Sequence, residues 1–351
     1  MSLLLTRVVD AATIGQIVAK TGLPALYDMV IERLTSIGVS SGIDQRRRDG
    51  FLLTTPHDGL LEWMPAVRHG RTVSVKLVGY NPHNPAAYQL PTVLSTICAF
   101  DVATGHLRTL VDGTFVTAVR TGAASAVASR ILADPESRVL GLVGCGAQAV
   151  TQLHALTRVF SFTEVLIYDE DSAAVRSFAK RARFAGDTVR SVGLAELQRR
   201  ADIICTATSV LPRRGPVLPG DQLRPAVHVN AVGADMPGKT ELPMSLLREA
   251  TVCPDDLEQA RHEGECQRLT DDEIGPSLTD LLRDPDRYAH LRGSRTVYDS
   301  TGLAVQDLLM IELVEELADA YGLGNWVALE ASGGDARDPY AFLDAELAEA
   351  V

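Results

Sequence analysis

RVLGLVGCGAQAVTQLHAL, residues 138–156, has the form of an apolar strand, a glycine-rich turn and a helix. This pattern is typical of a dinucleotide pyrophosphate site at a helix N-terminus. Gly144 permits the tight turn, Gly146 lets the backbone approach a pyrophosphate, and Ala149 allows close packing of helix on strand. Free N–H groups and the helix dipole favour an anion there. The alternative is a glycine-rich turn that binds no ligand.

The next predicted strand, TEVLIYD, strengthens the nucleotide interpretation. It ends at Asp169, 25 residues after Gly144 and close to where an acidic residue receives the ribose hydroxyls. A carboxylate would repel a 2′-phosphate, so NAD is favoured over NADP as the cofactor. Glu170 and Asp171 follow directly, and either of them could be the ribose ligand instead.

The composition narrows the class of protein. The 351 residues are enough for two domains, and 46% hydrophobic with 22% charged residues is ordinary for a soluble globular protein. The net charge of −12 argues against nucleic acid or an anionic membrane as a partner, although the basic run 46–48 is either a solvated loop or an anion-binding segment. The five cysteines form no CxxC pair or zinc-ligand spacing, and no apolar run has membrane-spanning length. We expect a cytoplasmic protein with no membrane segment, disulfide framework or metal site.

The residues before the glycine turn predict a different kind of domain. A helix is predicted over 25–34, and from Gly50 short β-rich runs follow one another, with a hairpin at 103–105. Consecutive strands without intervening helices favour an antiparallel sheet. A helix is predicted from Thr121 to the Asp134-Pro135 pair, and another over 300–321.

After residue 140, predicted strands alternate with helices, as in a parallel doubly wound sheet. The sequence therefore predicts an α/β fold with two domains. Residues 121–310 would form a Rossmann-type dinucleotide-binding domain. Residues 1–120, together with 311–351, would form an α+β domain with an antiparallel sheet.

Four charged residues outside the glycine turn lie in apolar surroundings: Glu62, Lys76, Arg120 and Asp235. Asp235 ends a predicted strand of the nucleotide domain, at the edge where ligands bind, and its carboxylate could serve as a general acid/base. Arg48, Lys76 and Arg120 would hold a carboxylate substrate if they converge. Glu62 lies in LLEWMP. Each of the strand residues could instead point to solvent.

Four segments in order, RTGAASAVASRILA, GLVGCGAQAVTQLHAL, NAVGADMPGKTELP and VYDSTGLAVQD, resemble the ornithine cyclodeaminase and mu-crystallin family. The resemblance covers residues 48–307. Within it, EWMP, KLVGYNPHNP, GAQAVTQLHAL and EGECQRL look most like lysine cyclodeaminases of bacterial secondary metabolism. The resemblance implies a homodimer that pairs through the antiparallel sheets of the first domain, and a Rossmann domain that holds NAD.

The resemblance also implies roles for single residues. Arg48, Lys76 and Arg120 match positions that hold the substrate carboxylate. Glu62 matches the carboxylate that receives the distal amino group, and Asp235 matches the catalytic acid/base. Positions at or near the cofactor, besides Gly144 and Gly146, are Thr121, Ala147, Gln148, Asp169, Thr208, Ser209, Val232 and Ser300. The assignment of Arg48 rather than its two arginine neighbours depends on an alignment across a loop.

The activity implied is conversion of L-lysine or L-ornithine to L-pipecolate or L-proline with release of ammonia. Hydride would leave the α-carbon and return to a cyclic imine, with NADH recycled in the site. A ketimine reductase or amino-acid dehydrogenase would share the fold, and a non-catalytic protein that binds NAD(P) or a small ligand is an alternative of another class. Glu62 favours a diamino acid. Lysine and ornithine differ by one methylene, and the sequence leaves that choice open.

Overall fold

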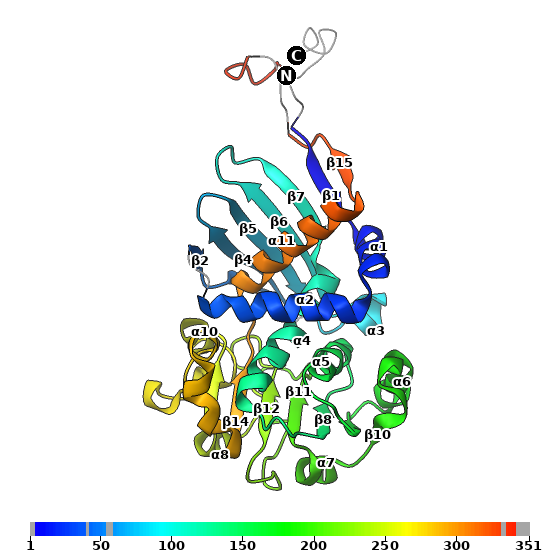
Figure 1. Ribbon diagram of the computed structural model, residues 1–351, viewed down its shortest axis with the longest axis vertical. Coiled ribbons are helices and arrows are strands. Elements are labelled where there is room, and N and C mark those ends of the chain that lie inside the picture. Colours follow the sequence, from blue (N-terminus) through cyan, green and yellow to red (C-terminus); the bar gives the residue numbers. More distant parts are fainter. Residues whose placement is uncertain (1–3, 40–41, 54–58, 331–334, 342–351) are drawn as a thin grey trace.

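The computed structural model describes residues 4–39, 42–53, 59–330 and 335–341. Figure 1 shows two lobes, each built on its own β-sheet, with the N-terminal strands in the upper lobe and β8 (Val139–Val143) in the lower one. The predicted α/β fold class, a Rossmann-type unit joined to an α+β unit, is confirmed.

The lower lobe contains an all-parallel sheet of seven strands in the order β10-β9-β8-β11-β12-β14-β13. The order reverses between β8 and β11, and ligands bind outside the carboxyl ends of the strands at such a point. The other strands are β9 (Glu164–Tyr168), β10 (Val189–Ser191), β11 (Ile203–Thr206), β12 (His228–Ala231), β13 (Thr251–Pro254) and β14 (Thr296–Asp299).

Helices connect these strands and cover the sheet. Gly144 follows β8 with a φ of +94°, and a Cβ there would lie 2.6 Å from the Ala207 carbonyl oxygen, so the turn requires glycine. The α-helices are α5 (Ala147–Thr157), α6 (Ser172–Arg181), α7 (Leu194–Arg200), α8 (Met244–Glu249), α9 (Leu257–Ala260) and α10 (Leu278–Arg283). The 3₁₀ segments are η2 (Arg183–Thr188), η3 (Glu265–Arg268), η4 (Asp271–Glu273) and η5 (Pro285–Gly293).

The upper lobe contains an eight-stranded sheet in the order β15-β1-β7-β6-β5-β4-β2, with β3 also paired to β4. The predicted antiparallel sheet is in fact mixed, because β1 pairs in parallel with β7. The hairpin predicted at 103–105 is confirmed, since it joins β6 to β7. The strands are β1 (Thr6–Val9), β2 (Ile43–Gln45), β3 (Asp49–Leu53), β4 (Gly59–Arg68), β5 (Thr72–Tyr80), β6 (Val93–Asp101), β7 (Leu107–Asp112) and β15 (Asn325–Val327).

The remaining helices pack on the upper sheet or join the lobes. They are α1 (Ala11–Thr21), α2 (Leu23–Thr35), α3 (Asn84–Tyr88), α4 (Gly113–Leu132) and α11 (Ala304–Tyr321), with η1 (Ser36–Val39) after α2. The helix predicted from Thr121 begins earlier, at Gly113, because the Asp112 carboxylate caps it by accepting the Thr114 N–H at 3.1 Å. The predicted boundary at 120/121 falls inside α4, and the division into two domains stays a prediction. Residues 331–334 and 342–351 of that division lie outside the described residues.

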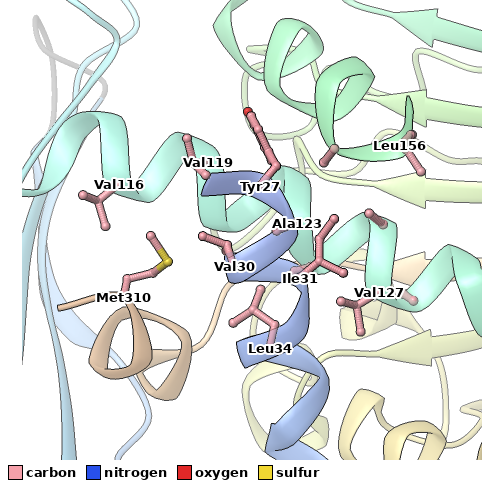
Figure 2. Packing of buried hydrophobic residues seen from close by; sticks show 14 of the residues in the cluster. Tyr27, Val30, Ile31, Leu34, Val116, Val119, Ala123, Val127, Leu156 and Met310 are labelled. Carbon is pink, nitrogen blue, oxygen red and sulfur yellow. The ribbon is translucent and has the colours of Figure 1, made fainter. Parts of the chain in front are cut away.

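One apolar core joins the lobes around α4. Figure 2 shows side chains of α2 against those of α4, with Met310 of α11 beside them. Helix α4 is buried around almost its whole circumference, as expected for a helix enclosed by other elements. The core therefore holds residues 120 and 121 in place between the two sheets. The labelled residues are Tyr27, Val30, Ile31, Leu34, Val116, Val119, Ala123, Val127, Leu156 and Met310.

Candidate active site

A cavity of about 110 Å³ is lined from both lobes and brings together all five charged residues singled out in the sequence. The upper lobe supplies Arg48 from the link between β2 and β3, Glu62 from β4 and Lys76 from β5. Helix α4 supplies Arg120, and the loop after β12 supplies Asp235. None of these side chains points simply to solvent, so the convergence that residue spacing could not establish is present.

Arg48 is the arginine of the basic run that enters the cavity, while Arg46 and Arg47 are exposed. Its Nη1 lies 3.3 Å from Glu62 Oε2, its Nε lies 2.8 Å from Glu263 Oε1, and its Nη2 donates to the Thr301 carbonyl. Burial lowers the pKa of Arg48, but the Glu263 and Glu62 carboxylates outweigh it, and the net shift is upward. Arg48 is therefore a fixed, buried cation.

Lys76 and Arg120 share one buried carboxylate, that of Asp307 on α11. Lys76 Nζ lies 2.8 Å from Asp307 Oδ2, and Arg120 Nε donates to Oδ1 at 3.2 Å. Burial, and then the Arg120 charge, lower the pKa of Lys76 to about 7, while Asp307 opposes the shift. Two basic side chains that share one carboxylate leave a binding position for a further anion, such as a carboxylate. Asp307 was not selected from the sequence, although it ends the VYDSTGLAVQD segment.

Two carboxylates, Glu62 and Glu263, flank Arg48. Burial raises the pKa of Glu62, against the opposing effect of Arg48. Burial raises the pKa of Glu263 to about 8, again opposed by Arg48. Both side chains, together with Arg48, line a second cavity of about 150 Å³. Glu263 was missed in the sequence, where its only signal is its place in EGECQRL.

Asp235 lies in the loop four residues beyond the end of β12 rather than at the end of the strand. The strand is shorter than predicted, and this loop carries the carboxylate over the cavity. Lys239 Nζ lies 2.8 Å from Asp235 Oδ1 and 4.8 Å from the centre of the Tyr80 ring. Lys239 is buried, and burial lowers its pKa, but Asp235 and Tyr80 together with weaker effects outweigh burial, so the net shift of the pKa is upward. Sequence reasoning missed Lys239, whose only signal is a charge four residues after Asp235.

A larger cavity of about 610 Å³ adjoins the first and shares Gln148, Val232 and Asp235 with it. No side chain caps the N-terminus of α5, and a Cβ built on Gly146 would meet nothing within 4 Å. An uncapped helix N-terminus with open space in front of it fits a pyrophosphate, so the arrangement suits a dinucleotide. Of the cofactor positions named from the sequence, the large cavity is lined by Gly146, Ala147, Gln148, Thr208, Ser209 and Val232, and the small one by Thr121, Gln148, Val232 and Ser300.

Gly144 and Asp169 lie next to this cavity without lining it. Asp169 Oδ2 accepts the Cys145 N–H of the glycine turn at 2.6 Å, and Oδ1 accepts the Asp171 N–H at 2.8 Å. Asp171 caps α6 by accepting the Ala173 N–H. Asp169 is therefore the acid that the fold attaches to the glycine turn, whereas Asp171 serves its own helix and Glu170 is exposed.

The described residues show no sign of a membrane span or a metal centre. No helix there combines the length and apolar character that a bilayer crossing requires. No cluster of histidine, cysteine, aspartate and glutamate in the same residues has an arrangement suited to a metal ion. All five cysteines lie in the described ranges, and all are free thiols.

Residues 12–321 match the model of the ornithine cyclodeaminase/mu-crystallin family. The L-lysine cyclodeaminase of Streptomyces rapamycinicus is 39% identical over 340 residues, which cover 96% of this chain and 99% of that protein. A solved structure of lysine cyclodeaminase, described as recognising L-lysine, L-ornithine and L-2,4-diaminobutyric acid, is 46% identical with a TM-score of 0.93, covering 96% of this chain and 99% of the other. An archaeal alanine dehydrogenase dimer with bound NAD is 30% identical with a TM-score of 0.82, covering 93% and 100%.

Proposed function

Because the chain belongs to the ornithine cyclodeaminase/mu-crystallin family, we propose that it is an NAD-dependent cyclodeaminase that converts L-lysine, or L-ornithine, to the cyclic amino acid and ammonia. One observation carries the proposal: the same cavity holds three basic side chains suited to an α-carboxylate and the buried carboxylate of Glu62, which is suited to a second amine. A diamino acid has both groups.

Arg48, Lys76 and Arg120 would bind the α-carboxylate, and their burial strengthens that attraction. Glu62 would receive the distal ammonium and steer it toward the α-carbon. Asp235 would move protons among the amino groups as general acid/base. When bound, NAD supplies the chemistry of hydride removal from the α-carbon and hydride return to the cyclic imine. The position of the cavity between the lobes would keep water from the imine.

We further propose that NAD occupies the large cavity. The cofactor positions named from the sequence would hold it, with the pyrophosphate at the N-terminus of α5 and the ribose at Asp169. The bond between Asp169 and the glycine turn supports NAD over NADP, because a 2′-phosphate would lie against that carboxylate. The archaeal alanine dehydrogenase that resembles this chain was solved with NAD.

A homodimer and a cytoplasmic location are also proposed. The outer face of the upper sheet carries Phe51, Leu61, Leu77 and Leu94, on four neighbouring strands and all partly exposed. A contiguous apolar face of this kind marks an interaction surface, and the related alanine dehydrogenase is a dimer. Free thiols at all five cysteines suit a reducing compartment.

The activity is tested by supplying the purified protein with L-lysine and with L-ornithine in the presence of catalytic NAD. We expect ammonia and cyclic product in equal amounts, with no external reductant and no net build-up of NADH. Stoichiometric NADH with an open-chain product would instead identify an amino-acid dehydrogenase.

One observation favours a second candidate, a ketimine reductase or amino-acid dehydrogenase. Glu62 is already paired with Arg48, so a substrate without a distal amine would leave no buried charge unpaired. Rapid NADH consumption with a cyclic imine, and no deamination of either diamino acid, would support this candidate. Binding of NAD without turnover of any amino acid or imine would point to a non-catalytic ligand-binding protein.

A further inference from the structure

Glu241, which follows Asp235 in the same loop segment, is a fully buried carboxylate that forms no ion pair within the described residues. A buried charge of this kind is costly unless hydrogen bonds compensate for lost water. Glu241 accepts four such bonds, so its charge is stabilised by donors that the fold places around it. The positions of these donors in the fold indicate a structural role for the Glu241 carboxylate.

The four donors belong to the ends of two neighbouring strands. Oε1 accepts the Thr208 N–H at 2.8 Å and the Thr208 hydroxyl at 2.7 Å, after the end of β11. Oε2 accepts the Thr206 hydroxyl at 2.6 Å and the Gly233 N–H at 2.8 Å, so it reaches from β11 to the loop after β12. One carboxylate therefore links the loop that carries Thr208, at the large cavity, to the loop that carries Asp235, which lines both cavities.

The backbone around the Glu241 carboxylate is closely packed. A Cβ on Gly233 would lie 2.4 Å from Glu241 Oε1, so only glycine allows this approach. The Glu265 carboxylate accepts the Glu241 N–H at 2.6 Å and thereby holds its backbone. The turn residue Gly144 in turn packs against Ala207, next to Thr208. Three loops at the carboxyl edge of the sheet are thus fixed relative to one another.

We propose that Glu241 is a positioning residue that sets the distance between the Thr208 loop and the Asp235 loop, and thereby aligns bound nicotinamide with the acid/base carboxylate. This inference rests on the proposed function, because it takes the Thr208 loop as a cofactor contact and Asp235 as the acid/base. Hydride transfer is sensitive to such alignment, because donor and acceptor must meet within a narrow range of distance.

Glutamine tests the role with little change of shape. A carboxylate accepts at both oxygens, whereas an amide accepts at one atom and donates at the other. In the Glu241→Gln variant the amide NH₂ would face N–H and O–H donors, so about half of the link is lost. Thr206→Val removes only one of the four donors and gives a milder variant.

Glu312 provides a matched control. It is a buried carboxylate of α11, bound to Arg68 through both oxygens, and it lines neither the small nor the large cavity. Glu312→Gln should lower the melting temperature without affecting cofactor alignment. It therefore separates a general loss of stability from a loss of positioning.

The experiment has two readouts: NAD affinity by calorimetry, and the primary isotope effect on kcat with L-lysine deuterated at the α-carbon. In Glu241→Gln we expect NAD to bind about 10-fold more weakly, the size expected when a buried hydrogen-bonding group loses its partner. The isotope effect should rise because hydride transfer becomes rate-limiting. Thr206→Val should lie between this variant and wild type, and Glu312→Gln should match wild type in both readouts.

The inference is overturned if the Glu241→Gln variant has the same NAD affinity and the same isotope effect as the wild-type protein. It is also overturned if Glu312→Gln changes both readouts as much as Glu241→Gln does. If the Glu241→Gln variant does not fold, the same two measurements on Thr206→Val test the inference, and wild-type values in that variant overturn it. If wild type deaminates no diamino acid, the proposed function fails separately. The isotope effect is then measured on imine reduction with NADH deuterated at the transferred position, and NAD affinity still decides the role of Glu241.

Discussion

Asp235 is the residue on which the proposed chemistry depends most. The Asp235→Asn variant keeps the size of the side chain but cannot accept a proton, so we expect kcat to fall about 1,000-fold. NAD affinity should stay within about 3-fold of wild type, because the large cavity keeps its other lining residues. Steady-state kinetics and calorimetry check both expectations. A variant that turns over at the wild-type rate would show that another group moves the protons.

Glu62 is the residue that distinguishes a diamino acid from a simple amino acid. In Glu62→Gln we expect the KM for L-lysine to rise about 30-fold or more, since a buried charge pair with the distal ammonium is lost. NADH-dependent reduction of a cyclic imine, which has no free distal ammonium, should change less.

Glu263 provides the control for this prediction, because its carboxylate also contacts Arg48. If Glu263→Gln raises the KM for lysine as much as Glu62→Gln does, Glu62 acts only by holding Arg48. If Glu62→Gln impairs lysine turnover and imine reduction equally, Glu62 does not bind the distal amine.

At the level of elements, α4 connects the chemistry to the fold. It packs so closely on α5 that a Cβ on Gly122 would lie 2.4 Å from the Thr151 carbonyl oxygen. This contact ties the helix that carries Arg120 and Thr121 to the helix whose N-terminus faces the large cavity. The relative position of substrate and cofactor therefore depends on one helix pair.

The pairing of β12 with β14 makes stability depend on pH. His228 on β12 is buried opposite Thr296, and burial lowers its pKa to about 4, against a weaker upward effect of Asn230. Because this pKa is below the value of about 6.5 in the unfolded chain, the unfolded state binds more protons between pH 4 and 6.5. Stability should therefore fall on acidification, with about 2 kcal/mol lost through this group between pH 7 and pH 5.

Urea unfolding at the two pH values measures this loss. The His228→Gln variant, which cannot take up a proton in this range, should lose less stability than wild type by about that amount. The same pH dependence in both proteins would mean that His228 does not contribute.

At the level of the whole molecule, the apolar outer face of the upper sheet should control assembly. Leu77→Glu places a charge in the middle of this face, and we expect the proposed dimer to dissociate to monomers. Sedimentation velocity measures the mass directly. Val39→Glu is the control, because Val39 is an exposed apolar residue at the end of η1 and belongs to no strand of the sheet. A dimer in the Leu77→Glu protein would place the interface elsewhere.

Much of the architecture could be predicted from the sequence because it depends on local patterns of residues. The glycine turn, the alternation of strands and helices after residue 140, and the hairpin at 103–105 each depend on neighbouring residues and on the periods of strand and helix. The differences are local too. Helix α4 begins before the predicted Thr121 because Asp112 caps it upstream, and β12 ends four residues before Asp235.

The partners of the site residues, in contrast, depend on the tertiary structure. Arg120 and Asp307 are 187 residues apart, and no spacing rule connects them. Lys239 and Glu241 follow Asp235 in a segment with no distinctive sequence pattern. Only in the folded chain, where the loops after β11 and β12 meet, does Lys239 pair with Asp235 and Glu241 link the two loops. Side-chain periodicity sets which elements form, so the sequence alone predicts the α/β fold and the nucleotide turn. Burial and charge pairing are set by elements far apart in the chain, so only the folded molecule decides which charges share one cavity.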